Sequence, residues 1–252
     1  MSSFLKRAYL FFLLMSSVCF GNAQQHTYYK WSASVGGGLL VYQGDLAPSA
    51  FGSYKTLKPA LSVSVSRILN PYFSVKAMVV FGSLKGNDSL YKHPSWRQQR
   101  NFNFFTPLTE WSALFVWSPY GNNSNELRKK ITPYLFAGAG ISFVNISRDY
   151  SRFDTTFFNF TTKQQRGLAT DIAKKLPQKL LVLPVGAGLS IYVSSRWSVN
   201  LETTFRYTFT DYLDGFSQAA NPARKDFYQA HTAGVTYRFG KKDPYDCPVI
   251  KF

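Results

Sequence analysis

The chain has 252 residues and is basic, with 29 Lys and Arg against 13 Asp and Glu and a formal net charge of +16. Its length suits one barrel-sized domain. In an exported protein this charge balance favours outer-membrane lipid headgroups or lipopolysaccharide phosphates as partners over nucleic acid. A net charge that serves only solubility is the alternative. Of the two cysteines, Cys19 lies in an N-terminal targeting segment, which excludes a fold held together by internal disulfides.

The N-terminus predicts a secretory signal peptide. Lys6 and Arg7 precede an apolar run over residues 8–18, and the small residues of Gly21-Asn22-Ala23 follow it. The run is shorter than the roughly 20 apolar residues that a spanning helix needs. We therefore predict cleavage after Ala23 and an exported mature chain.

Apolar and polar residues alternate through most of the mature chain. In SVNLETTFRYTFT, residues 198–210, Val199, Leu201 and Phe205 share one face, and polar side chains occupy the other. The same period of two predicts eight strands, at 29–42, 59–69, 72–84, 100–117, 131–145, 180–193, 197–211 and 227–239.

The connections between these strands alternate in length. Short turns at 70–71 and 194–196 alternate with long loops at 43–58, 85–99, 146–179 and 212–226. This predicts an all-β fold, an eight-stranded antiparallel outer-membrane β-barrel over residues 24–239, with both termini periplasmic. A soluble lipocalin-like barrel is the alternative, because alternation alone does not say which face is outward.

Two sets of residues favour the membrane barrel. Aromatic residues near the predicted strand ends would form girdles at the membrane interfaces: Trp117, Trp197, Tyr42, Tyr72, Tyr134, Tyr192 and Tyr237. Charged residues on the polar faces would pair in a narrow lumen: Lys76, Glu110, Glu202 and Arg206. We interpret the second set as a structural network of salt bridges, since an unpaired buried charge would cost several kcal/mol.

No pattern for catalysis or metal binding is evident. His26, His93 and His231 show no metal-ligand spacing, and there is no phosphate-binding or dinucleotide motif, so we expect no cofactor. A lipid A-modifying hydrolase that uses His231 is a minor alternative. The charged loop 146–179 fits either contact with phosphates at the cell surface or a solvated loop.

Four blocks of sequence resemble one known family, the PorG-like outer-membrane β-barrels of the type IX secretion system. The blocks are YQGDLAP, RNFNFFTPLTEWSALF, ITPYLFAGAGISFVN and LPVGAGLSIYVSSRWSVNLETTFRYTFTDYLDGFS. The resemblance implies a non-enzymatic accessory component that anchors a periplasmic ring assembly, including a lipoprotein, to the outer membrane. A stand-alone structural or adhesive surface barrel is the alternative.

The resemblance also bears on the acidic residues of TFTDYLDGFS. It implies that Asp211 lies at the end of the seventh strand and Asp214 in the outer loop that follows. Both would organise this loop by accepting backbone N–H hydrogen bonds, with Asp45 at the same rim. Residues 240–252 carry two prolines and no alternation, which predicts a periplasmic tail. In this tail we expect Tyr245 and Cys247 to contact the partner.

Overall fold

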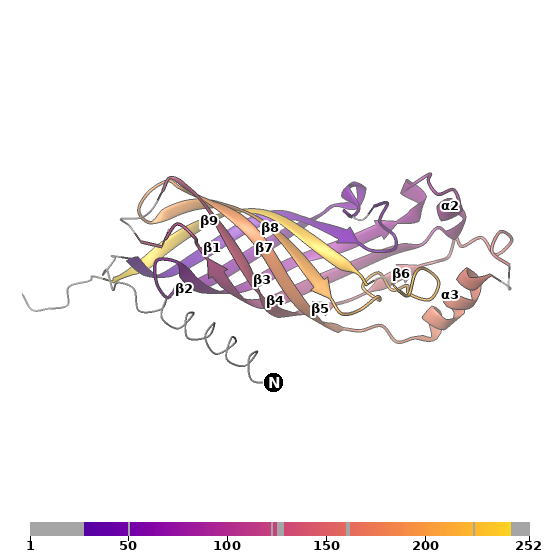
Figure 1. The fold of residues 1–252 in the computed structure, drawn as a ribbon. Coiled ribbons are helices and arrows are strands. Elements are labelled where there is room, and N and C mark those ends of the chain that lie inside the picture. Colours follow the sequence, from indigo (N-terminus) through magenta and orange to yellow (C-terminus); the bar gives the residue numbers. More distant parts are fainter. Residues whose placement is uncertain are drawn as a thin grey trace, which may run out of the picture.

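The computed structural model describes residues 28–49, 51–121, 123–124, 129–159, 162–223 and 225–242. Eight antiparallel strands form a closed barrel, because each pairs with its neighbour along the chain and the last, β9, pairs with the first, β1. Figure 1 shows the start of β1 and the end of β9 at one end of the barrel and the helices α2 and α3 at the other. The strands are β1 (Tyr28–Gln43), β2 (Lys58–Ile68), β3 (Phe73–Asn87), β4 (Asn103–Trp117), β5 (Ile131–Val144), β7 (Lys179–Tyr192), β8 (Trp197–Thr208) and β9 (Phe227–Lys242).

The predicted eight-stranded antiparallel barrel is confirmed, with small differences at the strand ends. Strand β8 ends at Thr208, so residues 209–211 already belong to the loop. Strand β9 continues to Lys242, beyond the predicted start of the tail at residue 240. Strand β9 extends this far because the first residues of β1 still pair with it, with Tyr28 opposite Lys242.

The outward face of the barrel is apolar. Residues opposite each other in neighbouring strands share a face, and one outward row runs Val63, Val79, Trp111, Ile141 and Leu181. Trp111 is 58% exposed and Leu181 is 55% exposed, whereas serines, Lys76 and Arg206 are buried inside. An apolar exterior around a polar-lined interior is the pattern of a transmembrane barrel and is the reverse of the lipocalin-like alternative.

The predicted aromatic girdle needs a correction. Trp117, Trp197 and Tyr72 are exposed near strand ends, as expected for interface anchors. Tyr42 and Tyr134, by contrast, are buried in the lumen, and Tyr192 accepts a hydrogen bond there from Arg238. These tyrosines occupy the inward parity of their strands, which places their hydroxyls among the lumen's charged groups.

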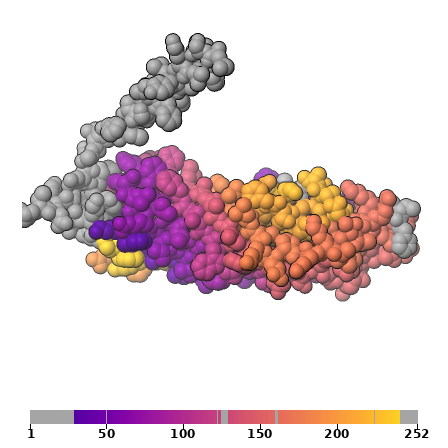
Figure 2. Space-filling model, turned by 90° about the horizontal axis from the view of Figure 1, so that it is seen from below, coloured from indigo at the N-terminus to yellow at the C-terminus, as the bar shows by residue number. Residues whose placement is uncertain are grey.

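The long loops form a structured cap at one end of the barrel (Figure 1). The cap contains two short 3-10 helices, η2 (Tyr54–Thr56) and η3 (Asp88–Leu90), the helices α2 (Trp96–Arg100) and α3 (Lys163–Ala173), and the short strand β6 (Ser147–Asp149). In Figure 2 the salmon and orange atoms of this cap occupy one end of the elongated molecule. No described helix has the length and apolar character needed to cross a membrane.

The capped half of the lumen is filled by an apolar core. Leu40, Leu84 and Phe104 point inward from the strands and belong to the same buried cluster as Phe102 and Phe216 from the loops. The rings of Phe102 and Phe216 are stacked, with centroids 4.1 Å apart. The cap and the upper barrel therefore share one continuous core.

Candidate functional site

One ion pair lies within the filled half of the lumen. Arg206 Nε donates to Glu110 Oε2 at 2.5 Å, and the two side chains are 1% and 0% exposed. The Tyr228 hydroxyl donates to the same carboxylate oxygen at 2.7 Å and also contacts Ser142. Because β4, β8 and β9 supply these groups, the pair joins opposite walls of the barrel and closes the passage between them.

A second ion pair lies nearer the short-turn end. Lys76 Nζ donates to Glu202 Oε1 at 2.5 Å, and the Tyr134 hydroxyl donates to the same oxygen at 2.6 Å. Lys76 also lies over the rings of Tyr134 and Phe136. The structure thus brings the four charged lumen residues of the sequence together as two pairs, with Arg206 bound to Glu110 and not to Glu202.

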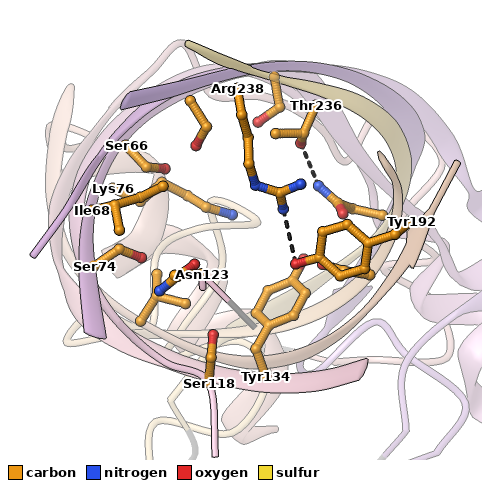
Figure 3. Close-up of a pocket in the computed structure, with 15 residues that line it drawn as sticks. Ser66, Ile68, Ser74, Lys76, Ser118, Asn123, Tyr134, Tyr192, Thr236 and Arg238 are labelled. Carbon is orange, nitrogen blue, oxygen red and sulfur yellow. Dashed lines mark hydrogen bonds between the residues drawn. The ribbon is translucent and has the colours of Figure 1, made fainter. Parts of the chain in front are cut away.

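Below the second pair, a polar cavity opens toward the short turns (Figure 3). It measures about 520 Å³ including its open mouth and is lined by hydroxyl groups together with Lys76 and Arg238. Figure 3 shows Arg238 reaching across this space to Tyr192, to which it donates a hydrogen bond of 2.9 Å. The short-turn half of the lumen is therefore a polar vestibule that reaches Lys76.

Two buried carboxyls meet at the capped rim. The Tyr42 hydroxyl lies 2.7 Å from Asp214 Oδ2 and 2.8 Å from Asp226 Oδ1. A tyrosine hydroxyl has one proton to donate, so the second short contact requires a proton on one of the carboxyls. Gly44 makes this arrangement possible, because a Cβ at that position would overlap Asp226 and Tyr42.

The environment of these acids favours their neutral forms. Burial, and then the charge of Asp226, raise the pKa of Asp214 well above its ordinary value. Burial likewise raises the pKa of Asp226, with the charges of Asp211 and Asp45 adding to the effect. Burial raises the pKa of Asp211 to about 6, although Ser217 lies close enough to offset part of this shift.

These shifts predict that the cap is more stable at acidic than at neutral pH. A carboxyl whose folded pKa is raised binds its proton more tightly in the folded state, so stability falls as pH rises above its unfolded pKa of about 3.9 and through the raised value. The hydrogen-exchange protection factors of residues 209–226, which are corrected for the intrinsic pH dependence of amide exchange, should be higher at pH 5 than at pH 8. Asp214→Asn should remove most of this difference, because its amide can donate to Tyr42 while Tyr42 donates to Asp226. Lys225 and Asp171 also face the cluster, so an unchanged pH dependence in Asp214→Asn would assign the effect to other groups.

Two further clamps hold the cap. Arg97 of α2 donates to the carbonyl oxygens of Asp45, Leu46 and Ala47 at 3.0, 3.3 and 2.7 Å. Asp171 of α3 accepts hydrogen bonds from the Tyr212 hydroxyl and from three consecutive backbone N–H groups, those of Ser217, Gln218 and Ala219. Both helices therefore fasten neighbouring loops onto the rim.

The three acids predicted to organise loops behave differently. Asp45 accepts from the N–H of Asn221 and Asp214 from that of Phe216. Neither carboxylate oxygen of Asp211 has a hydrogen-bond partner in the part of the chain that the structure describes. Asp226 takes the expected role instead, by accepting from the N–H of Leu213 at 3.0 Å.

Sequence reasoning missed Asp226 and Asp171. A signal for α3 was present: Thr162 and Gln165 have the spacing of a helix-capping box, and the Thr162 hydroxyl accepts from the N–H of Gln165. Recognising this helix from the sequence would have shown that Asp171 lies within it. For Asp226, which immediately precedes β9, the sequence carries no comparable signal.

His231 lies on the outward face of β9, opposite Leu39 of β1. Its ring nitrogens contact the hydroxyls of Thr203 and Tyr54, at 3.2 and 3.5 Å.

Across the described ranges, no group of three His, Cys, Asp or Glu side chains could hold a metal ion. The candidate contact residues Tyr245 and Cys247 lie outside the described residues.

A family model, "Domain of unknown function (DUF6089)", matches residues 6–248. The chain belongs to the DUF6089 family. No curated protein matches its sequence.

Several solved outer-membrane proteins are similar to this DUF6089 chain. OprG from Pseudomonas aeruginosa has 10% identity and a TM-score of 0.46, over 86% of this chain and 99% of its own. Neisserial surface protein A has 15% identity and a TM-score of 0.41, over 83% and 97% of the two chains. The outer membrane enzyme PagL has 12% identity and a TM-score of 0.37, over 82% and 99%. These scores are too low to carry an argument, so the architecture rests on the strand pairing described above.

Proposed function

We propose that this DUF6089 protein is a non-enzymatic barrel of the outer membrane that anchors a periplasmic assembly of the type IX secretion system, in the manner of PorG-like proteins. The observation that carries the proposal is the closed lumen. Arg206–Glu110, Lys76–Glu202 and the apolar core above them fill the space that a channel would need. A barrel filled in this way acts through its two ends and its lipid-facing surface.

The orientation follows from the connections. In outer-membrane barrels the short turns face the periplasm and the long loops face outward. An even number of strands then puts the start of β1 and the end of β9 on the periplasmic side, at the same end of the barrel as the vestibule mouth. The compact turns 69–72 and 193–196 offer little surface there, which favours the C-terminal segment and the 118–130 connection as contacts for the partner.

A stand-alone structural or adhesive surface barrel is the second candidate. Its support is the ordered cap, in which Arg97, Asp171 and the Phe102–Phe216 stack hold the long loops in one arrangement. A structured outward surface of this kind suits recognition outside the cell. The lipid A hydrolase that would use His231 has less support, because the ring stacks on Tyr54 and its nitrogens meet the Tyr54 and Thr203 hydroxyls, with no carboxyl partner among the described residues.

The test is a pull-down of the full-length protein from detergent-solubilised outer membrane, followed by mass spectrometry. Removal of residues 243–252 should leave the barrel folded, because β9 pairs with β1 as far as Lys242. The periplasmic partners, including a lipoprotein, should then be lost from the pull-down. Cys247→Ser and Tyr245→Ala, made separately, would locate the contact, and heat-modifiable migration on a gel would verify folding.

Full recovery of the same partners after this truncation would place the contact elsewhere. A pull-down from the intact protein that contains no periplasmic ring component would contradict the anchoring role and favour the stand-alone barrel.

A further inference from the structure

The lipid-facing surface is hollowed along a row of small residues. Ala77, Ala113 and Ala139 are direct neighbours across β3, β4 and β5. Larger apolar side chains surround them and line an open groove: Val63, Val65, Val79, Trp111, Ile141, Phe143 and Leu181. In a membrane such a groove is filled by lipid, since water is absent at this depth.

A cation lies at the capped end of this groove. Lys179 pairs with Phe143 in neighbouring strands, and its Nζ is 5.6 Å from the centre of the Phe143 ring. Phe143 itself lines the groove, so Lys179 lies directly beside the apolar wall of the groove. Such an ammonium group, held over an aromatic ring at the membrane interface, can bind a lipid phosphate.

A second group of lysines extends the positive charge along the same rim. Lys58 Nζ lies 5.9 Å from the centre of the Phe105 ring, and Lys85 pairs with Phe105 across β3 and β4. Asp149 pairs with Asn103, two residues before Phe105, and opposes this charge locally. Lys179 is therefore the better-placed cation for the groove.

We propose that the groove binds an acyl chain of a phosphorylated glycolipid of the outer leaflet, with a lipid phosphate on Lys179. The argument is complementarity: an apolar groove of the lipid-exposed surface ends at a cation on the side of the long loops. The choice of leaflet rests on the orientation under the proposed function. The binding chemistry does not rest on the proposed function, because Lys179 and the groove belong to the barrel wall and are unchanged by the truncation that the pull-down tests.

The experiment is native mass spectrometry of the purified, delipidated protein in detergent, titrated with lipid A and with lipid A whose phosphates have been removed. The unmodified protein should retain one lipid A and bind the dephosphorylated form more weakly. Lys179→Gln should raise the dissociation constant about fivefold, because a lysine near an anionic lipid surface contributes about 1 kcal/mol. Ala113→Leu, which adds bulk toward the lipid, should weaken both ligands.

Arg67→Gln is the matched control, since Arg67 lies over the ring of Trp31, 4.7 Å from its centre, at the opposite end of the barrel. It should leave lipid A binding unchanged. Equal binding by the unmodified protein and Lys179→Gln, or equal binding of the two lipids, would overturn the proposal. A loss of affinity in Arg67→Gln alone would overturn it too, by placing the lipid at the other rim.

Discussion

Arg206→Ala is expected to destabilise the barrel by about 3–5 kcal/mol, because it leaves the Glu110 carboxylate buried without its cation. Glu110 is fully buried, and its remaining described partner through Oε2 is the Tyr228 hydroxyl. The measurement is urea unfolding in lipid vesicles, followed by the loss of the heat-modifiable folded band. A cost below about 1 kcal/mol would show that Glu110 takes up a proton or finds water.

A double-mutant cycle identifies the partner of Arg206. Arg206→Ala and Glu110→Ala should be strongly non-additive, whereas Arg206→Ala and Glu202→Ala should be close to additive, since Glu202 binds Lys76. Arg206 Nη1 and Glu110 Oε1 have no hydrogen-bond partner in the described ranges. For that reason, Arg206→Met combined with Glu110→Leu should recover most of the stability that either single change removes.

Asp171→Ala is expected to release the 209–226 loop from α3. The carboxylate accepts from three backbone N–H groups at 2.9 to 3.1 Å and from the Tyr212 hydroxyl at 3.1 Å, and Asp171 is fully buried. Leaving such donors unsatisfied should cost the closed loop about 3 kcal/mol, which corresponds to roughly 100-fold faster hydrogen exchange.

Hydrogen exchange read by mass spectrometry checks this over residues 209–226. Asp154→Ala is the matched control, because Asp154 lies in the same long loop and accepts from the N–H groups of Thr156 and Phe157 in an exposed turn. Its effect should remain confined to that turn. Equal exchange of the 209–226 loop in both variants would mean that the Phe102–Phe216 stack, and not Asp171, holds the cap.

Much of the barrel was predictable because strand periodicity is local. Side chains alternate across a strand, so parity alone placed Glu202 and Arg206 on one face of β8. The same parity places Tyr42 with Leu40, which is buried, and would have shown that Tyr42 belongs to the lumen. The girdle interpretation relied on closeness to strand ends and overlooked this rule.

The strand number, the alternation and the positions of the long connections can be read from the residue pattern, because each of these depends on residues close together along the chain. The pairing of Arg206 with Glu110 required the folded barrel, since the choice between Glu110 and Glu202 depends on how β4 and β8 are staggered across the lumen. The folded barrel likewise decided that Asp226 and Asp171 organise the cap, while Asp211 receives no such hydrogen bond from the described chain. Their partners come from loops distant in sequence, and closing the barrel is what brings those loops to one rim.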